Sequence, residues 1–258
     1  MEFKDYLSLS TSVISNKYRN QNTINELKAT FKNQGYVTLP NFYNEDFFSI
    51  LQGESTRMEA KRIERNFTMP GYNTPRHLSV IGGKLIFKNS LIFPMLYLNF
   101  EIRSMLSSII GSELYSVNHE EEFMVINYLE RKGGTHGWHV DDPRYALVII
   151  LQAPERSEGG YLEVIPDWKE YCASRGYDPI TDTNMAVKEA YANNQVKKIF
   201  HNTGDCYLLN AGNCLHRVAP ISGETRRIIL NMAFDDRVAL EYGYTADVLY
   251  GEKDAVTQ

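Results

Sequence analysis

The spacing of apolar positions divides the chain into a helical first part and a strand-rich second part. In the first part apolar residues recur at helical spacing. Thr23 and Glu26 match a capping box, which predicts a helix that carries Phe31 on its apolar face and ends at Gly35.

Three further elements are predicted before Gly111. The run YVTLP (residues 36–40) is typical of a short strand, and Asn44 is expected to cap a second helix. A third helical region covers residues 90–111, and we expect it to kink or break near Pro94, because proline removes a backbone donor.

After Gly111 the pattern changes to short runs rich in β-branched and aromatic residues. These runs are EEFMVINYLE, YALVIILQAP, GGYLEVIP, DCYLLNA, HRVAPI and RRIILNMAFD, separated by Gly, Pro, Asn or Asp. Such strands without alternating helices predict an antiparallel sandwich or barrel. The polar segment 168–194 interrupts them and is either a lid over a site or an inert excursion. We expect a single domain over 1–258, with a mostly helical part (1–111) and a barrel core (112–236).

Composition excludes several classes of function. The chain is 43% hydrophobic and 23% charged with a net charge of -5, and its basic clusters are only pairs. A nucleic-acid or anionic-membrane surface would need a basic patch, so neither partner is expected. The chain has three cysteines without a CxxC, an N-terminal region unlike a signal peptide, and no long apolar stretch. We expect a cytoplasmic protein, and a homodimer is compatible with the sequence.

The stretch HGWHVDD concentrates four candidate metal ligands. His139 and Asp141 are two residues apart, so on a strand both side chains would point to one face. His136 has an odd offset from His139 and cannot join that face in a continuous strand. Two histidines and one carboxylate suit non-heme Fe(II), but the motif is short, and a loop histidine beside a solvated acid is the alternative.

Two later residues complete a pattern. His216 follows an apolar run and offers the second histidine. Arg227 shares a strand face with Ile229 and Asn231, and an arginine directed into a barrel would need an anion such as a dicarboxylate. Otherwise Arg227 is an ordinary exposed residue at a strand end.

In this order, the H-x-D motif, His216 and Arg227 resemble the Fe(II)/2-oxoglutarate oxygenases. EGGYLEVIP (residues 158–166) is similar to a hairpin of that superfamily, and Tyr128 to a tyrosine that faces the cosubstrate. The resemblance implies a double-stranded β-helix (jelly-roll, cupin-like) core with N-terminal helices. It also implies Fe(II), 2-oxoglutarate and O2, with His139, Asp141 and His216 as the catalytic metal ligands and with Arg227 and Tyr128 at the cosubstrate.

Together with TPRH, HEEEF and LQAPE, the HGWH block resembles the BesD-type enzymes, which halogenate or hydroxylate free amino acids, chiefly lysine. In that branch halogenases carry a small residue two positions after the first histidine, where this chain has Asp141. The resemblance therefore implies hydroxylation of L-lysine at an unactivated carbon, by hydrogen abstraction and hydroxyl rebound.

The same resemblance implies roles for five polar residues. Arg76 and His136 would bind the amino-acid carboxylate, Glu122 and Asp142 would accept from ammonium groups, and Asn231 would add a polar contact. Each could instead be a solvated side chain, and Asp142 could orient a neighbouring histidine.

Several alternatives stay open. The substrate could be ornithine or a carrier-bound or peptidyl residue, the enzyme could be a halogenase, and a jelly-roll sensor of metal or ligand would need no chemistry. His77, His119 and His201 are interpreted as structural or surface residues. Whether Trp138 and Tyr250 pack over the substrate is left undecided.

Overall fold

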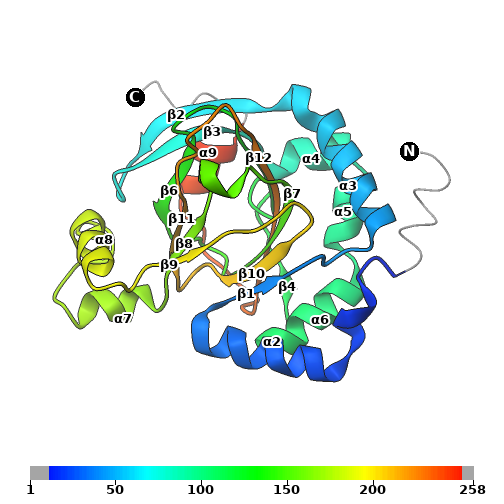
Figure 1. Ribbon diagram of the computed structural model, residues 1–258, viewed down its shortest axis with the longest axis horizontal. Helices are drawn as coiled ribbons and strands as arrows, with labels where there is room; N and C mark the ends of the chain where they lie inside the picture. Colours follow the sequence, from blue (N-terminus) through cyan, green and yellow to red (C-terminus); the bar gives the residue numbers. More distant parts are fainter. Residues whose placement is uncertain (1–11, 252–258) are drawn as a thin grey trace.

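The strands pair into one antiparallel sheet that curls on itself in the computed structural model (Figure 1), which describes residues 12–251. The strands are β1 (Tyr36–Leu39), β2 (Ile63–Met69), β3 (Thr74–Ile81), β4 (Tyr115–Ser116), β5 (Met124–Leu129), β6 (Thr135–His139), β7 (Tyr145–Gln152), β8 (Leu162–Ile165), β9 (Lys197–Ile199), β10 (Cys206–Asn210), β11 (Leu215–Val218) and β12 (Arg227–Asp235). Their order is β1-β10-β7-β12-β5-β3-β6-β11-β8-β9, with β2 beside β3 and β4 beside β12. This is the predicted jelly-roll core.

Helices cover one outer side of the sheet (Figure 1). The helices are η1 (Asn16–Arg19), α2 (Gln21–Gln34), α3 (Glu45–Met58), η2 (Glu59–Lys61), α4 (Gly83–Asn89), α5 (Ile92–Tyr97), α6 (Phe100–Ile110), η3 (Arg156–Glu158), α7 (Trp168–Ala173), α8 (Thr183–Ala192) and α9 (Thr245–Tyr250). None of the helices within residues 12–251 is long and apolar enough to cross a membrane.

The helix ends agree with the sequence in part. Gly35 ends α2 with a φ of 71°, as expected. However, α2 begins one turn earlier than the predicted capping box, because the side chain of Asn20 accepts from the backbone N–H of Asn22. Asn44 caps α3 by accepting from the N–H of Phe47.

The third helical region is broken later than expected. Its two helices, α5 and α6, are separated at Leu98 and Asn99, and the side chain of Asn99 caps α6. Pro94 lies in the first turn of α5, where its missing N–H is not needed. The prediction of a break near Pro94 was therefore wrong.

Both faces of the central strands are buried. Along β7, alternate residues pack toward the helices or toward the interior of the curled sheet: Leu147, Ile149 and Leu151 on the helical side, and Ala146, Val148 and Ile150 inside. This explains why β7 is apolar throughout rather than alternating. On each strand, the residues whose side chains point into the curled sheet are therefore the candidates for a functional site.

The β2–β3 hairpin was not anticipated from the sequence. Strand β3 pairs with β5 at one end, where Ser79 lies opposite Tyr128. At its other end it pairs with β6, where Arg76 lies opposite His136. The hairpin thereby closes the sheet beside the H-x-D segment.

Candidate active site

Strand β6 carries a bulge that places both of its histidines on one face. His139 lies opposite His216 on β11, and His136 lies opposite Val218, so three steps along β6 match two along β11. The extra residue absorbs the odd offset between the histidines. Their rings stack with centroids 4.1 Å apart. The expectation that His136 points away from His139 therefore fails, because the strand is not regular.

Three side chains converge beside this bulge. The candidate ligand atoms of His139, Asp141 and His216 all lie within 4.8 Å of one another. Oδ1 of Asp141 lies 3.4 Å from Nε2 of His139 and 3.7 Å from Nε2 of His216. Asp141 follows the end of β6, where its N–H donates to the carbonyl of Ala211. The structure thus brings together the predicted two-histidine, one-carboxylate set.

The hydrogen bonds of the two histidines leave the correct nitrogens exposed to a metal. Nδ1 of His139 lies 2.6 Å from the carbonyl oxygen of Gly137, and Nδ1 of His216 lies 3.0 Å from that of Cys214. Because a carbonyl only accepts, each Nδ1 carries the hydrogen and each Nε2 keeps its lone pair. Burial also lowers the pKa of His139 well below its usual value, which favours the neutral imidazole. This donor set fits Fe(II).

An interior cavity extends from these three residues to Arg227. Tyr207, Ile229 and Asn231 also line it. The Arg227 side chain is buried and donates to the hydroxyl of Tyr207, but its Nη2 has no hydrogen-bond partner among the described residues. A buried guanidinium with an unpaired N–H favours an anion in this cavity.

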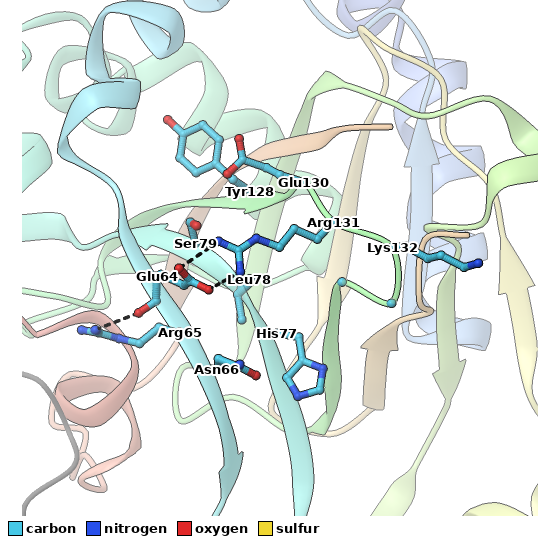
Figure 2. Close-up of a pocket in the computed structure, with 12 residues that line it drawn as sticks. Glu64, Arg65, Asn66, His77, Leu78, Ser79, Tyr128, Glu130, Arg131 and Lys132 are labelled. Carbon is cyan, nitrogen blue, oxygen red and sulfur yellow. Dashed lines mark hydrogen bonds and ion pairs between the residues drawn. The ribbon is translucent and has the colours of Figure 1, made fainter. Parts of the chain in front are cut away.

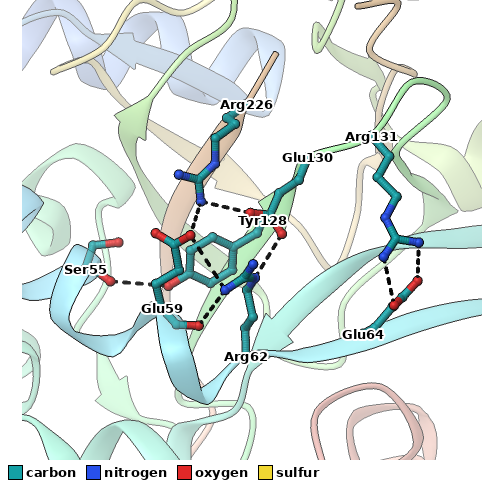
Figure 3. Close-up of polar contacts among 8 residues, drawn as sticks. All are labelled: Ser55, Glu59, Arg62, Glu64, Tyr128, Glu130, Arg131 and Arg226. Carbon is teal, nitrogen blue, oxygen red and sulfur yellow. Dashed lines mark hydrogen bonds and ion pairs between the residues drawn. The ribbon is translucent and has the colours of Figure 1, made fainter. Parts of the chain in front are cut away.

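The structure does not bring Tyr128 to this cavity, contrary to expectation. Its hydroxyl lies 3.5 Å from the carbonyl oxygen of Ser55 on α3, and Arg62 packs over its ring (Figure 3). Asn127, the preceding residue, lines the interior instead. Tyr207, rather than the predicted Tyr128, lies in this cavity and contacts Arg227.

Tyr128 borders a different cavity, of about 220 Å³, between β2–β3 and the loop after β5. Figure 2 shows Arg131 and Glu64 at this cavity, joined by two hydrogen bonds of 2.5 and 2.9 Å. The iron-ligand set does not line it, so we do not assign it to the active site.

Besides the interior cavity, a pocket of about 210 Å³ adjoins the candidate metal ligands. Four of the five predicted substrate residues line this pocket: Arg76, Glu122, His136 and Asp142. His139 and Asp141 also border it. The fifth, Asn231, lies in the interior cavity.

The pocket holds polar atoms that lack protein partners. Nε of Arg76, Nε2 of His136 and Oε2 of Glu122 are buried without hydrogen bonds among the described residues. Burial lowers the pKa of Arg76 to about 10. Burial, followed by the charges of Asp141, Asp142 and Asp247, raises the pKa of Glu122 to about 9. The pocket therefore contains a guanidinium nitrogen, an imidazole nitrogen and an acid that all lack hydrogen-bond partners.

The C-terminal segment closes part of this pocket. Tyr244, Thr245, Leu249 and Tyr250 contribute to its lining, and Tyr250 also lines the interior cavity. Oδ2 of Asp142 accepts from the N–H of Gly243 at 2.8 Å, which ties this segment to the residues after β6. None of these contacts is predicted from the sequence, where only the role of Tyr250 is left as an open question.

The insertion packs on the outer face of the sheet. Trp168 on α7 and Val187 on α8 belong to one apolar cluster with Trp138, which points away from the pocket and lies under Arg217. Within the insertion only Ile180 lines the pocket, among the residues that the structure describes. A lid function for residues 168–194 stays a prediction.

The remaining histidines lie away from the metal ligands. His201 is buried and stacks on Tyr207 with ring centroids 4.6 Å apart. His119 lies beside Tyr242, and His77 borders the cavity of about 220 Å³ that Tyr128 also borders. His201 thus supports a residue of the interior cavity.

Comparisons with known proteins agree with this geometry. Residues 19–250 match the sequence model of the family described as Halogenase D. No curated protein matches the chain. Among solved structures, SnoN, the non-heme α-ketoglutarate-dependent epimerase from nogalamycin biosynthesis, has a TM-score of 0.67 at 16% identity over 93% of this chain and 92% of its own.

Two other solved structures have the same fold. The carbocyclase SnoK, also α-ketoglutarate-dependent, has a TM-score of 0.64 at 15% identity, over 84% of this chain and 85% of its own. HygX from Streptomyces hygroscopicus, solved with nickel and 2-oxoglutarate, has a TM-score of 0.58 at 13% identity, over 84% and 89% of the two chains. At these identities the likeness concerns the fold.

Proposed function

Because the chain belongs to the Halogenase D family, we propose that it is an Fe(II)- and 2-oxoglutarate-dependent hydroxylase of a free basic amino acid, with L-lysine as the substrate. One observation carries the proposal: the carboxylate of Asp141 lies against both Nε2 atoms of His139 and His216, beside a pocket whose guanidinium, imidazole and acid have unpaired polar atoms.

Each part of the cofactor set has residues that suit it. His139, Asp141 and His216 would hold Fe(II), and Arg227 with Tyr207 would hold the distal carboxylate of 2-oxoglutarate. When bound, these groups and O2 supply the oxidation, with succinate and carbon dioxide as coproducts.

The pocket suits a zwitterion with an additional ammonium group. Arg76 and His136 can donate to the α-carboxylate, and Glu122 and Asp142 can accept from ammonium groups. A long, unbranched molecule held at both ends would present a methylene to the metal ligands that border the pocket. The volume of about 210 Å³ is below the usual range for drug-sized ligands, which favours a free amino acid over a peptide.

Asp141 favours hydroxylation over halogenation. A carboxylate at this position can serve as the third protein ligand, and chloride would then have no vacated position to occupy. The halogenase alternative therefore requires that Asp141 does not bind the metal.

The proposal is tested by anaerobic reconstitution with Fe(II) and 2-oxoglutarate, followed by O2 and a panel of free amino acids with mass detection. We expect a mass gain of one oxygen on lysine. Gain on ornithine alone, turnover only with a peptide, or a chloride-dependent product would each replace the proposed substrate or reaction. Binding of iron without 2-oxoglutarate decarboxylation would indicate a sensor.

The assignment of the carboxylate needs a separate variant. Asp141→Gly should abolish or sharply reduce hydroxylation, because it removes one of three protein ligands. Full hydroxylation activity in Asp141→Gly would mean that another carboxylate completes the site.

A further inference from the structure

His201 is buried but does not belong to the described residues that line the interior cavity. It is 5% exposed and lies in the loop between β9 and β10. The residue on which it stacks, Tyr207, lines the cavity together with Arg227. A role of His201 toward a molecule in this cavity therefore acts through Tyr207.

Hydrogen bonds fix the loop that carries His201. Both carboxylate oxygens of Asp205 accept from backbone N–H groups: Oδ2 from Asn202 at 2.8 Å and Oδ1 from Asn41 at 3.2 Å. The N–H of Ile150 on β7 donates to the carbonyl oxygen of Asp205 at 2.9 Å. The loop is thus attached to β7 and to the segment after β1, and the backbone of His201 has a defined place.

The imidazole of His201 contacts both members of a cross-strand pair. Thr38 on β1 lies opposite Tyr207 on β10, so both side chains point to the same face of the sheet. The ring of His201 stacks on that of Tyr207, with centroids 4.6 Å apart and an interplanar angle of 27°. Its Nε2 lies 3.3 Å from Oγ1 of Thr38. These two contacts hold the ring of Tyr207 from one side.

The charge state of His201 suits a place behind an arginine. Burial, followed by the charge of Arg227, lowers the pKa of His201 to about 3. The imidazole is therefore neutral near pH 7. A neutral ring holds Tyr207 without repelling the guanidinium of Arg227.

We propose that His201 is a positioning residue for 2-oxoglutarate, which it does not touch: it stacks on Tyr207 and so fixes the hydroxyl against which Arg227 is oriented. Arg227 donates to that hydroxyl and keeps its Nη2 unpaired for the distal carboxylate. A guanidinium binds a carboxylate best as a planar fork, and a fixed contact keeps that plane. Without His201 the ring of Tyr207 gains freedom that cosubstrate binding must remove. The inference rests on the proposed function.

Calorimetric titration of 2-oxoglutarate into the Fe(II)-loaded full chain without O2 tests the proposal. His201→Ala should weaken 2-oxoglutarate binding about 3- to 10-fold, because it removes the stacked ring. His201→Phe keeps a ring on Tyr207 and should bind within about twofold of the wild type. In the Tyr207→Phe background, His201→Ala should weaken binding by less than about twofold, because the positioned hydroxyl is already absent.

Tyr171→Ala is the matched control for the loss of a buried, stacked ring. Tyr171 is 8% exposed and stacks on Trp168 with centroids 5.6 Å apart, but neither residue lines the interior cavity or the substrate pocket. This variant should lower Tm and leave the affinity for 2-oxoglutarate unchanged.

Two outcomes would overturn the positioning role. One is an unchanged affinity for 2-oxoglutarate in His201→Ala. The other is an equal loss of affinity from His201→Ala in the wild-type and Tyr207→Phe backgrounds, since a general packing defect does not depend on the hydroxyl of Tyr207. A wild-type chain that binds Fe(II) but not 2-oxoglutarate would refute the proposed function, and this inference with it.

Discussion

Replacing Arg227 by methionine should weaken 2-oxoglutarate binding and stabilise the ligand-free protein at the same time. Arg227 is 4% exposed, the described hydrogen-bond partner of its guanidinium in the cavity is Tyr207, and its Nη2 is unpaired. A buried charge without an anion costs free energy in the ligand-free state. With the cosubstrate bound, the same group would form charge-assisted hydrogen bonds to a carboxylate.

The two effects have different sizes. Loss of one partner of a buried charge pair costs about 2–5 kcal/mol, which corresponds to roughly 30-fold to several thousand-fold weaker binding. Removing the buried charge is expected to stabilise the ligand-free fold by about 1–4 kcal/mol. Each kcal/mol of added stability should raise Tm by ~2–4 °C.

Calorimetric titration of 2-oxoglutarate into the Fe(II)-loaded protein without O2 measures the affinity, and thermal unfolding without 2-oxoglutarate measures the stability. Tyr207→Phe removes one hydrogen bond to a charged group and should weaken binding by about 1.5–3 kcal/mol, roughly 10- to 150-fold. Tyr128→Phe should leave the affinity unchanged, since Tyr128 packs against α3. The reasoning fails if Arg227→Met binds 2-oxoglutarate within about threefold of the wild type, or if Tyr128→Phe is as damaging as Tyr207→Phe.

Three further outcomes are expected. The pKa of Glu122 is raised to about 9 in the folded protein, whereas a glutamate in the unfolded chain has a pKa of about 4.3. Between about pH 4.3 and pH 9 the folded state therefore binds a proton that the unfolded state has released. The free energy of unfolding consequently falls as the pH rises through this range. Glu122→Gln should therefore melt above the wild type near pH 8 but not near pH 4; parallel pH profiles would contradict this. Ni(II) at about 100 times its Kd should raise Tm by about 5–10 °C, and this gain should disappear in His216→Ala. In Gly137→Ala the new Cβ would lie 2.6 Å from the carbonyl oxygen of Pro75, which should cost about 1–3 kcal/mol in urea denaturation, whereas Gly53→Ala, with open space, should not destabilise.

The strands of the barrel could be predicted because their apolar runs are separated by turn residues. The metal ligands could be predicted as well, since His139 and Asp141 lie close together in sequence and His216 follows a clear strand. The β2–β3 hairpin could not, because its residues are largely polar and one of its faces is exposed, as at Glu64 and Asn66. Its role in closing the sheet depends on pairing with β5 and β6.

Side-chain direction was harder to predict than strand position. All six residues of β5 are buried, so alternation alone does not show whether Asn127 or Tyr128 points inward. Alternation also fails for His136, because the bulge in β6 adds one residue to its pairing with β11. His136 and His139 therefore lie on the same face of the strand although their spacing is odd. Long-range register, rather than local pattern, decides both cases.

The two adjacent arginines at the start of β12 create an ambiguity of register that the outer surface resolves. A slip of one residue would turn Arg226 inward and Arg227 outward, and the cavity would still receive a guanidinium. Arg226 is held outside by Glu59, at 2.6 Å, and by Glu130, at 2.8 Å (Figure 3). Because Glu59 follows α3 and Glu130 follows β5, the helical layer and the neighbouring strand together select which arginine enters the barrel. Glu59 and Glu130, which lie outside the cavity, therefore fix the register of β12.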